Sequence, residues 1–293
     1  MNLNNNNICP FAWYTDPKYR NHNRPYYRGS GWALIAPLYS LPPFQILRTT
    51  ALGDAITNIT LTSVATGATF DLTGSLPASG FNVQQFTPAN QDPYDLLVYS
   101  GATIEELPTP EGLYEATMTD GTNTWYSERF QMRAYVDDLV KIEYWHITPF
   151  EVVGHHISYE APYKNIVYFD SYINKPEYIE EEEVEKRDGY ELPIYLLSKK
   201  TYRIIGLLLP EYLCDALRFL WMHSYVTISY NGIDYVTDRV RVIFGDWQLR
   251  GNICEAVIEF DTDTVATETG IILDELDGGD YDQTDYNDDY LKL

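Results

Sequence analysis

Apolar and polar residues alternate with a period of two along the middle of the chain. Within Leu113 to Thr119 every second residue is apolar, Asp120-Gly121 follows, and an aromatic-rich run extends from Thr124 to Met132. Alternation ahead of an Asp-Gly pair is typical of a β-hairpin, because glycine supplies the positive φ that a tight turn needs. The pattern therefore predicts two antiparallel strands that meet at Asp120-Gly121.

The same alternation recurs nearer the C-terminus. Val226, Ile228 and Tyr230 alternate with polar residues ahead of Asn231-Gly232, and this pattern predicts a second hairpin with Ile233 to Val236. Further strands are predicted at Ala55 to Ser63, Asp95 to Tyr99, Leu139 to Ile147, Asn165 to Tyr172, Glu191 to Leu197, Thr201 to Leu208 and Ile253 to Phe260.

One segment has the period of an α-helix. Pro210 fits the first helical position, where its missing N–H costs nothing. The apolar residues beyond it form one stripe that consists of Leu213, Ala216, Leu217, Leu220 and Trp221. The pattern predicts an amphipathic helix at 210–222 whose stripe faces a core.

A charged run from Glu180 to Arg187 has no apolar period. Glu182 and Lys186 stand four residues apart, as do Glu183 and Arg187. Opposite charges at this spacing stabilise a helix. The run therefore predicts a short, exposed helical turn.

Together these elements predict a mainly β protein with two β-sandwich-like domains, at 31–136 and at 137–268, the second carrying the helix. Residues 1–30 are rich in Asn, Pro, Tyr and Arg and predict an extended arm, which docks on its own body or on a neighbouring subunit; a flexible terminus is the alternative. Residues 269–293 are acidic and low in complexity, and they predict a tail that does not fold alone.

The charge of the chain narrows the choice of partners. Its 293 residues include 43 acidic and 20 basic side chains, for a net charge of −23. Such a surface repels phosphate backbones and anionic membranes, and it suits basic partners or a channel wall to which DNA does not adhere.

Nothing in the sequence predicts export or membrane insertion. The three cysteines Cys9, Cys214 and Cys254 are too few for a disulfide framework, and an odd count suits a reducing compartment. Residues 1–7 lack the basic and apolar regions of a signal peptide, and no apolar run is long enough to cross a bilayer. We expect a soluble protein made in a cytoplasm.

Catalytic and metal-binding motifs are missing from the sequence. It contains no nucleophile elbow, phosphate loop, dinucleotide fingerprint or zinc-binding spacing. His155-His156 is the only histidine cluster, and neighbours on a strand point to opposite faces. We therefore predict that the protein is not an enzyme and has no catalytic residues, cofactor or metal.

The candidate functional parts are surfaces. We predict interfaces at the arm, at the Glu180–Arg187 turn and at the acidic tail, and we expect that deletion of residues 1–28 leaves the body folded and impairs assembly. The candidate interface residues are Trp13, Tyr14, Tyr26, Tyr27, Arg28, Glu182, Lys186, Arg187, Tyr281, Tyr286 and Tyr290.

Several phrases of the sequence carry a resemblance to a known group of proteins. They run from Tyr168 to Ser171, from Lys175 to Tyr178, from Glu181 to Tyr190 and from Pro210 to Arg218, with Asp120 to Glu128 ahead of them. Together they resemble structural proteins of tailed phages that infect Bacteroidetes, crAss-like phages included. The likeness covers the chain from Gly112 to Phe260.

This resemblance implies a virion protein of the neck or tail barrel, assembled in the bacterial cytoplasm. It implies a cyclic homo-oligomer, twelvefold in symmetry, that contacts portal or other neck and tail proteins. DNA would pass through the ring without specific binding, and we expect part of the negative charge to line that channel.

Two other functions stay open on the sequence alone. A receptor- or glycan-binding tail adhesin would stack exposed Tyr and Trp side chains on sugars. A hydrolase of host polysaccharide would need a cleft with two facing carboxylates, to which the sequence does not point.

Overall fold

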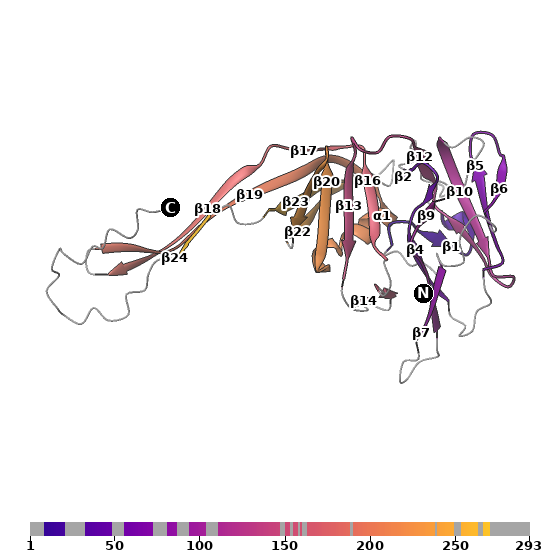
Figure 1. Cartoon of the computed structure of the whole chain (residues 1–293), viewed down its shortest axis with the longest axis horizontal. Helices are drawn as coiled ribbons and strands as arrows, with labels where there is room; N and C mark the ends of the chain where they lie inside the picture. Colours follow the sequence, from indigo (N-terminus) through magenta and orange to yellow (C-terminus); the bar gives the residue numbers. More distant parts are fainter. Residues whose placement is uncertain are drawn as a thin grey trace. The chain divides into compact units, whose positions relative to one another are not determined.

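The protein is mainly β, and its strands form several sheets (Figure 1). The computed structural model describes residues 9–20, 33–48, 56–72, 81–86, 94–103, 111–146, 150–152, 155–157, 159, 163–187, 190–237, 239–248, 253–262 and 266–269. The chain divides into two compact units. The first consists of Met1–Glu177 and Lys200–Asp263, and the second of Tyr178–Lys199 and Thr264–Leu293.

The N-terminal half of the first unit is built around a sheet in the order β1-β11-β10-β12-β2, in which β5 also pairs with β10 and with β6. Its strands are β1 (Trp13–Tyr14), β2 (Leu34–Pro37), β5 (Asn58–Ser63), β6 (Thr69–Asp71), β10 (Gly112–Thr119), β11 (Thr124–Ser127) and β12 (Phe130–Arg133). The predicted hairpin is confirmed, since Thr119 pairs with Thr124 and Met118 with Trp125.

The predicted strand from Thr124 to Met132 runs along β10 and is interrupted by a β-bulge. Both β11 and β12 pair with β10, and their registers differ by one residue across Ser127 to Arg129. The Ser127 hydroxyl accepts from the amide of Ala116 at 2.8 Å and donates to the carbonyl of Glu128 at 2.8 Å. This side chain replaces the ladder bonds that the bulge removes.

A second sheet, in the order β4-β8-β7, packs against the first through aromatic side chains. It consists of β4 (Phe44–Arg48), β7 (Phe81–Phe86) and β8 (Tyr94–Tyr99), and two short strands, β3 (Ser40–Leu41) and β9 (Ala102–Thr103), pair separately. The ring of Phe44 lies 5.1 Å from that of Tyr99 and 6.0 Å from that of Phe11. Phe11 in turn contacts Phe130 at 5.3 Å.

The C-terminal half of the first unit contains two further sheets. One has the order β16-β13-β20-β21 and the other the order β17-β19-β23-β22. Their strands are β13 (Val140–Trp145), β16 (Asn165–Phe169), β17 (Tyr172–Ile173), β19 (Tyr190–Pro210), β20 (Tyr225–Tyr230), β21 (Ile233–Thr237), β22 (Val240–Gln248) and β23 (Ile253–Asp261). Figure 1 shows β13, β16 and β20 side by side. The short strands β14 (Phe150–Val152) and β15 (His155–Ile157) pair with each other.

The alternation of apolar residues produces the core between these two sheets. On β23 the alternating residues from Cys254 to Phe260 are buried, as the sequence predicts. The ring of Tyr202 stacks on that of Phe260 at 5.5 Å, and Tyr235 of the other sheet contacts Phe260 at 5.7 Å. The second predicted hairpin is confirmed as well: Tyr230 pairs with Ile233, and Asn231 and Gly232 both have positive φ.

The helix is shorter than its period predicts. α1 spans Glu211–Leu217, with Pro210 at the N-cap, and a 3₁₀ turn, η4, follows at Leu220–Met222. The prediction that Trp221 belongs to the buried stripe is wrong, because its side chain is 61% exposed. The change from α to 3₁₀ geometry after Leu217 turns this residue out of the helical stripe.

The prediction of a helical turn at Glu180–Arg187 is wrong. This segment lies in a strand, β18 (Glu177–Arg187), which pairs with β19. Charges four residues apart also share one face of a strand, so their spacing does not distinguish the two structures. The strand forms because β19 supplies backbone partners that an isolated turn does not have.

Strand β19 is continuous where the sequence predicts two strands around Ser198-Lys199-Lys200. It runs from Tyr190 to Pro210, and the boundary between the two units falls within it, between Lys199 and Lys200. The polar break in the sequence therefore marks the boundary between units. In the second unit β19 also pairs with β24 (Ala266–Thr269).

The N-terminal segment is not an extended arm throughout. Residues 9–14 are buried, Trp13 is 3% and Tyr14 1% exposed, and β1 adds to the edge of β11. The sequence left open what this segment contacts. The structure shows that the part from Cys9 to Arg20 packs on its own chain. The predicted domain boundary near residues 136–137 lies inside the first unit, and the two-domain layout stays a prediction.

Candidate interaction site

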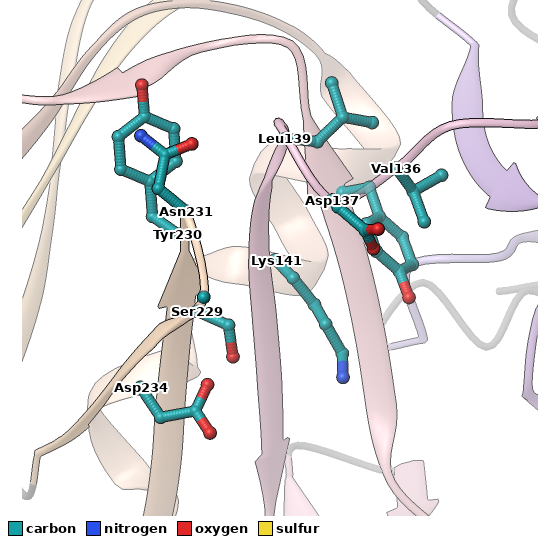
Figure 2. A pocket seen from close by; sticks show the side chains of 10 residues that line it. Val136, Asp137, Leu139, Lys141, Ser229, Tyr230, Asn231 and Asp234 are labelled. Carbon is teal, nitrogen blue, oxygen red and sulfur yellow. The ribbon is translucent and has the colours of Figure 1, made fainter.

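A pocket of about 410 Å³ opens at one end of the β16-β13-β20-β21 sheet (Figure 2). One side is formed by the loop that precedes β13, which contributes Val136, Asp137 and Leu139. The opposite side is the positive-φ turn at Asn231-Gly232. The predicted hairpin turn thus forms one wall of this pocket.

The floor of the pocket follows from strand register. Lys141 of β13 pairs with Tyr168 of β16 on one side and with Ser229 of β20 on the other, and Ser229 pairs with Asp234 of β21. These four side chains therefore form one row on the outer face of the sheet. Figure 2 shows Asp137 and Asp234 on opposite sides of Lys141.

Negative charge dominates this pocket. The ammonium of Lys141 lies 3.1 Å from the Glu143 carboxylate, which offsets its charge. Neither Asp137 nor Asp234 has an ion-pair partner among the residues that the structure describes. Burial, and then the charges of Glu143 and Asp137, raise the pKa of the Tyr168 hydroxyl to about 12. The site therefore favours a cationic group over an anion.

Farther along the same face lies a stacked aromatic pair. The rings of Trp145 and Tyr225 are 5.0 Å apart and 12° from parallel. The ammonium of Lys164 lies 4.3 Å from the centre of the Trp145 ring. Tyr225 is exposed, so this pair presents a flat aromatic surface to solvent.

A third feature is a set of exposed apolar side chains on two edge strands and on the turn η4. β21 and β22 are the last strands of their sheets and follow each other in the chain, and β22 lies against η4. We call this set the edge-strand group, and it consists of Trp221, Ile233, Val236, Ile243, Phe244 and Trp247. Large apolar side chains on an open strand edge are a feature that soluble proteins normally cover.

A buried polar network joins the N-terminal segment to the region around η4. The hydroxyl of Tyr163 lies 3.4 Å from the Cys9 thiol and donates to Asn165 at 2.8 Å, and the Asn165 amide donates to Tyr159 at 3.0 Å. Tyr159 lies 2.6 Å from Nε2 of His223, whose Nδ1 lies 2.9 Å from the carbonyl of Phe219. A carbonyl only accepts, so Nδ1 carries the proton and Nε2 accepts from Tyr159.

This network makes His223 a source of pH-dependent stability. Burial lowers the pKa of His223 from 6.5 to about 4, although contacts with the Phe219 and Leu220 carbonyls oppose the change. In the unfolded chain the ring binds a proton near its ordinary pKa. Its stabilising contribution is therefore complete above about pH 6.5 and is lost progressively toward pH 4, by about 3 kcal/mol in total.

We expect His223→Gln to remove this part of the pH dependence. The measurement is urea unfolding at several pH values between 7.5 and 4, compared as the difference between wild type and variant. His146→Gln is the matched control and should keep most of the wild-type slope, because the charge of His146 is the smallest of the causes that shift the pKa of His223. Equal slopes for wild type and His223→Gln would contradict the assignment.

The predicted interface residues are scattered. Trp13 and Tyr14 are buried in the chain itself, and Glu182 is exposed on β18. Lys186 and Arg187 also lie on β18. The remaining predicted interface residues, Tyr26, Tyr27, Arg28, Tyr281, Tyr286 and Tyr290, lie outside the described residues.

Sequence reasoning did not identify the pocket or the edge-strand group. The pocket depends on the register between Lys141 and Tyr168, which single-strand patterns do not contain. The edge-strand group had a visible signal, because Ile243-Phe244 places consecutive apolar residues on both faces of a strand. A strand with two apolar faces is covered on both sides or is exposed on one.

No known family model matches the chain, and no curated protein matches it. Among the described residues no group of three or more His, Cys, Asp or Glu side chains is placed to hold a metal ion. Nor does any helix in the described ranges have the length and apolar character needed to cross a membrane.

Proposed function

We propose that this chain is a virion structural protein, a ring subunit of a phage head–tail connector or tail barrel. In this proposal two β-sandwich-like domains, at 31–136 and 137–268, form a body that assembles through its surfaces into a cyclic, twelvefold homo-oligomer. The ring contacts other neck, tail or portal proteins, and DNA passes through its acidic channel without specific binding.

The observation that carries the proposal is the edge-strand group. Val236 is 61% exposed on β21, while Ile243, Phe244 and Trp247 are exposed on β22. Strand edges with such side chains supply both backbone hydrogen-bonding groups and apolar area to a partner. Closed rings need this kind of contact, in which one surface meets a different surface of the next copy.

We expect the double substitution Val236→Lys and Ile243→Lys to weaken self-association at least tenfold, about 1.4 kcal/mol. Both side chains are exposed, so the fold should not change. The measurement is native mass spectrometry and sedimentation velocity over a range of protein concentrations, with electron microscopy of any assembly to count its subunits.

The matched control replaces Tyr135 and Tyr172 by Lys. These side chains are 83% and 52% exposed and lie outside the edge-strand group. If both double variants associate as the wild type does, the edge-strand group is not the contact. A wild-type chain that stays monomeric alone and beside purified neck proteins would overturn the proposal.

One observation favours a second candidate, a glycan-binding tail adhesin. The Trp145–Tyr225 pair offers the flat aromatic surface on which sugar rings stack, with the Lys164 ammonium beside it. Binding of the isolated protein on a glycan array, lost in Trp145→Ala, would favour this candidate over the ring subunit.

A further inference from the structure

Two carboxylates line the pocket, on either side of Lys141. Asp137 and Asp234 approach the pocket from different elements, the loop before β13 and strand β21. Tyr168 and Tyr230 add aromatic rings, whose faces attract cations. Its volume of about 410 Å³ is in the range of pockets that enclose a small organic group. A guanidinium, which pairs readily with a carboxylate through two of its five donors, suits either of these two groups.

The chain itself contains one segment with the complementary chemistry. No acidic residue occurs from residue 17 to residue 53, although the whole chain carries a net charge of −23. The stretch contains five basic residues, of which the structure describes three: Lys18 pairs with Asp16, Arg20 with Glu115 and Arg48 with Asp95. The other two cations frame a pair of tyrosines in the sequence Arg24-Pro25-Tyr26-Tyr27-Arg28.

From this complementarity we infer that the pocket receives the Arg24–Arg28 segment of a second copy of this chain. The inference rests on the proposed function, since it assumes that copies associate. Each subunit would then make a second contact besides that of the edge-strand group. In this second contact the Arg24–Arg28 segment of one copy is the ligand, and the pocket of the next copy is the receptor. One arginine of the segment pairs with Asp137 or with Asp234, on either side of Lys141, and a neighbouring tyrosine covers the mouth of the pocket.

The test uses a fluorescent peptide with the sequence of residues 21–30 and the full-length chain as receptor. The receptor carries Arg24→Gln and Arg28→Gln, so that its own segment does not compete. We expect saturable binding that weakens at least tenfold when Asp137→Asn and Asp234→Asn are added. Replacing both arginines of the peptide by glutamine should weaken binding to a similar extent.

The matched control receptor carries Asp246→Asn and Glu255→Gln, two exposed carboxylates away from the pocket. It should bind the peptide as tightly as the unmodified receptor. If both double variants of the receptor lost affinity equally, or if a scrambled peptide bound as tightly, the peptide would be attracted only by the overall negative charge of the receptor. Either result would overturn the inference. So would the absence of saturable binding.

The result of the peptide titration can be distinguished from the result of the self-association experiment under the proposed function. A chain that assembles while its peptide does not bind would overturn only this inference. A chain that never assembles would overturn the proposed function, and the peptide titration would still report whether the pocket recognises the segment.

Discussion

Deletion of residues 1–20 is expected to abolish folding. The segment contributes Phe11, Trp13 and Tyr14 to the core, and each aromatic side chain of this kind is worth about 1.5–3 kcal/mol when buried. It also supplies β1 and the Arg20–Glu115 ion pair, whose atoms lie 2.6 Å apart. The summed loss approaches the total stability of a typical protein, about 5–15 kcal/mol.

The single substitution Trp13→Ala measures how much one of these aromatic side chains contributes to stability, in a chain that still folds. Trp13 contacts Phe11 at 5.4 Å and Phe44 at 4.8 Å, so its removal leaves a cavity between two sheets. We expect a loss of about 3–5 kcal/mol and a decrease of the melting temperature by about 10 °C. Circular dichroism and differential scanning calorimetry would measure both values.

Deletion of residues 2–7 is the matched control for the larger truncation. It removes residues ahead of the buried segment and should leave the unfolding transition nearly unchanged. If the chain without residues 1–20 instead unfolded cooperatively near the wild-type temperature, the segment would be an appendage, as the sequence first predicts for the arm.

Arg48→Ala is expected to cost about 3–5 kcal/mol, because it leaves two carboxylates buried without their cation. Arg48 pairs across the sheet with Asp95 at 3.3 Å and reaches Asp120 at 3.5 Å, and all three side chains are at most 1% exposed. Asp120 also accepts from the amides of Thr122 and Asn123, which fixes the turn between β10 and β11.

Those contacts determine the ionisation of Asp120. Burial alone would raise its pKa, but hydrogen bonds from Asn123 and Thr122, together with the charge of Arg48, outweigh burial and lower the pKa. The cost of Arg48→Ala should therefore shrink as the pH is lowered, since protonation of Asp120 in the variant removes part of the uncompensated charge. Denaturant unfolding at pH 7 and pH 4 would show this difference.

Arg129→Ala is the matched control. Arg129 forms an ion pair with Glu115 at 2.7 Å, but its side chain is half-exposed, and pairs of this kind contribute about 0–1 kcal/mol. Similar costs for Arg48→Ala and Arg129→Ala would contradict the argument from burial.

Local patterns predicted the elements that local chemistry determines. Asn231-Gly232 specifies its turn through positive φ, and the alternation from Cys254 to Phe260 specifies which face of β23 is buried. Both features are properties of a few consecutive residues. Mainly β architecture follows from the recurrence of such patterns along the chain.

The errors arose where distant residues decide the structure. Glu180 to Arg187 forms a strand because β19 lies beside it, and Trp13 is buried because β11 and β4 surround it. The pocket likewise depends on the meeting of residue 137 with residues 229–234. A single sequence without relatives contains the chemistry of these residues but not their neighbours in space.

The pairing of β1 with β11 has a consequence for synthesis on the ribosome. Trp13 is synthesised 114 residues before its partner Ser127. Until then Phe11, Trp13 and Tyr14 have no sheet to join, and contacts between such distant residues form slowly. The nascent chain therefore presents this aromatic segment to chaperones before its sheet exists, and the N-terminal sheet is completed only after Arg133 of β12 has been translated.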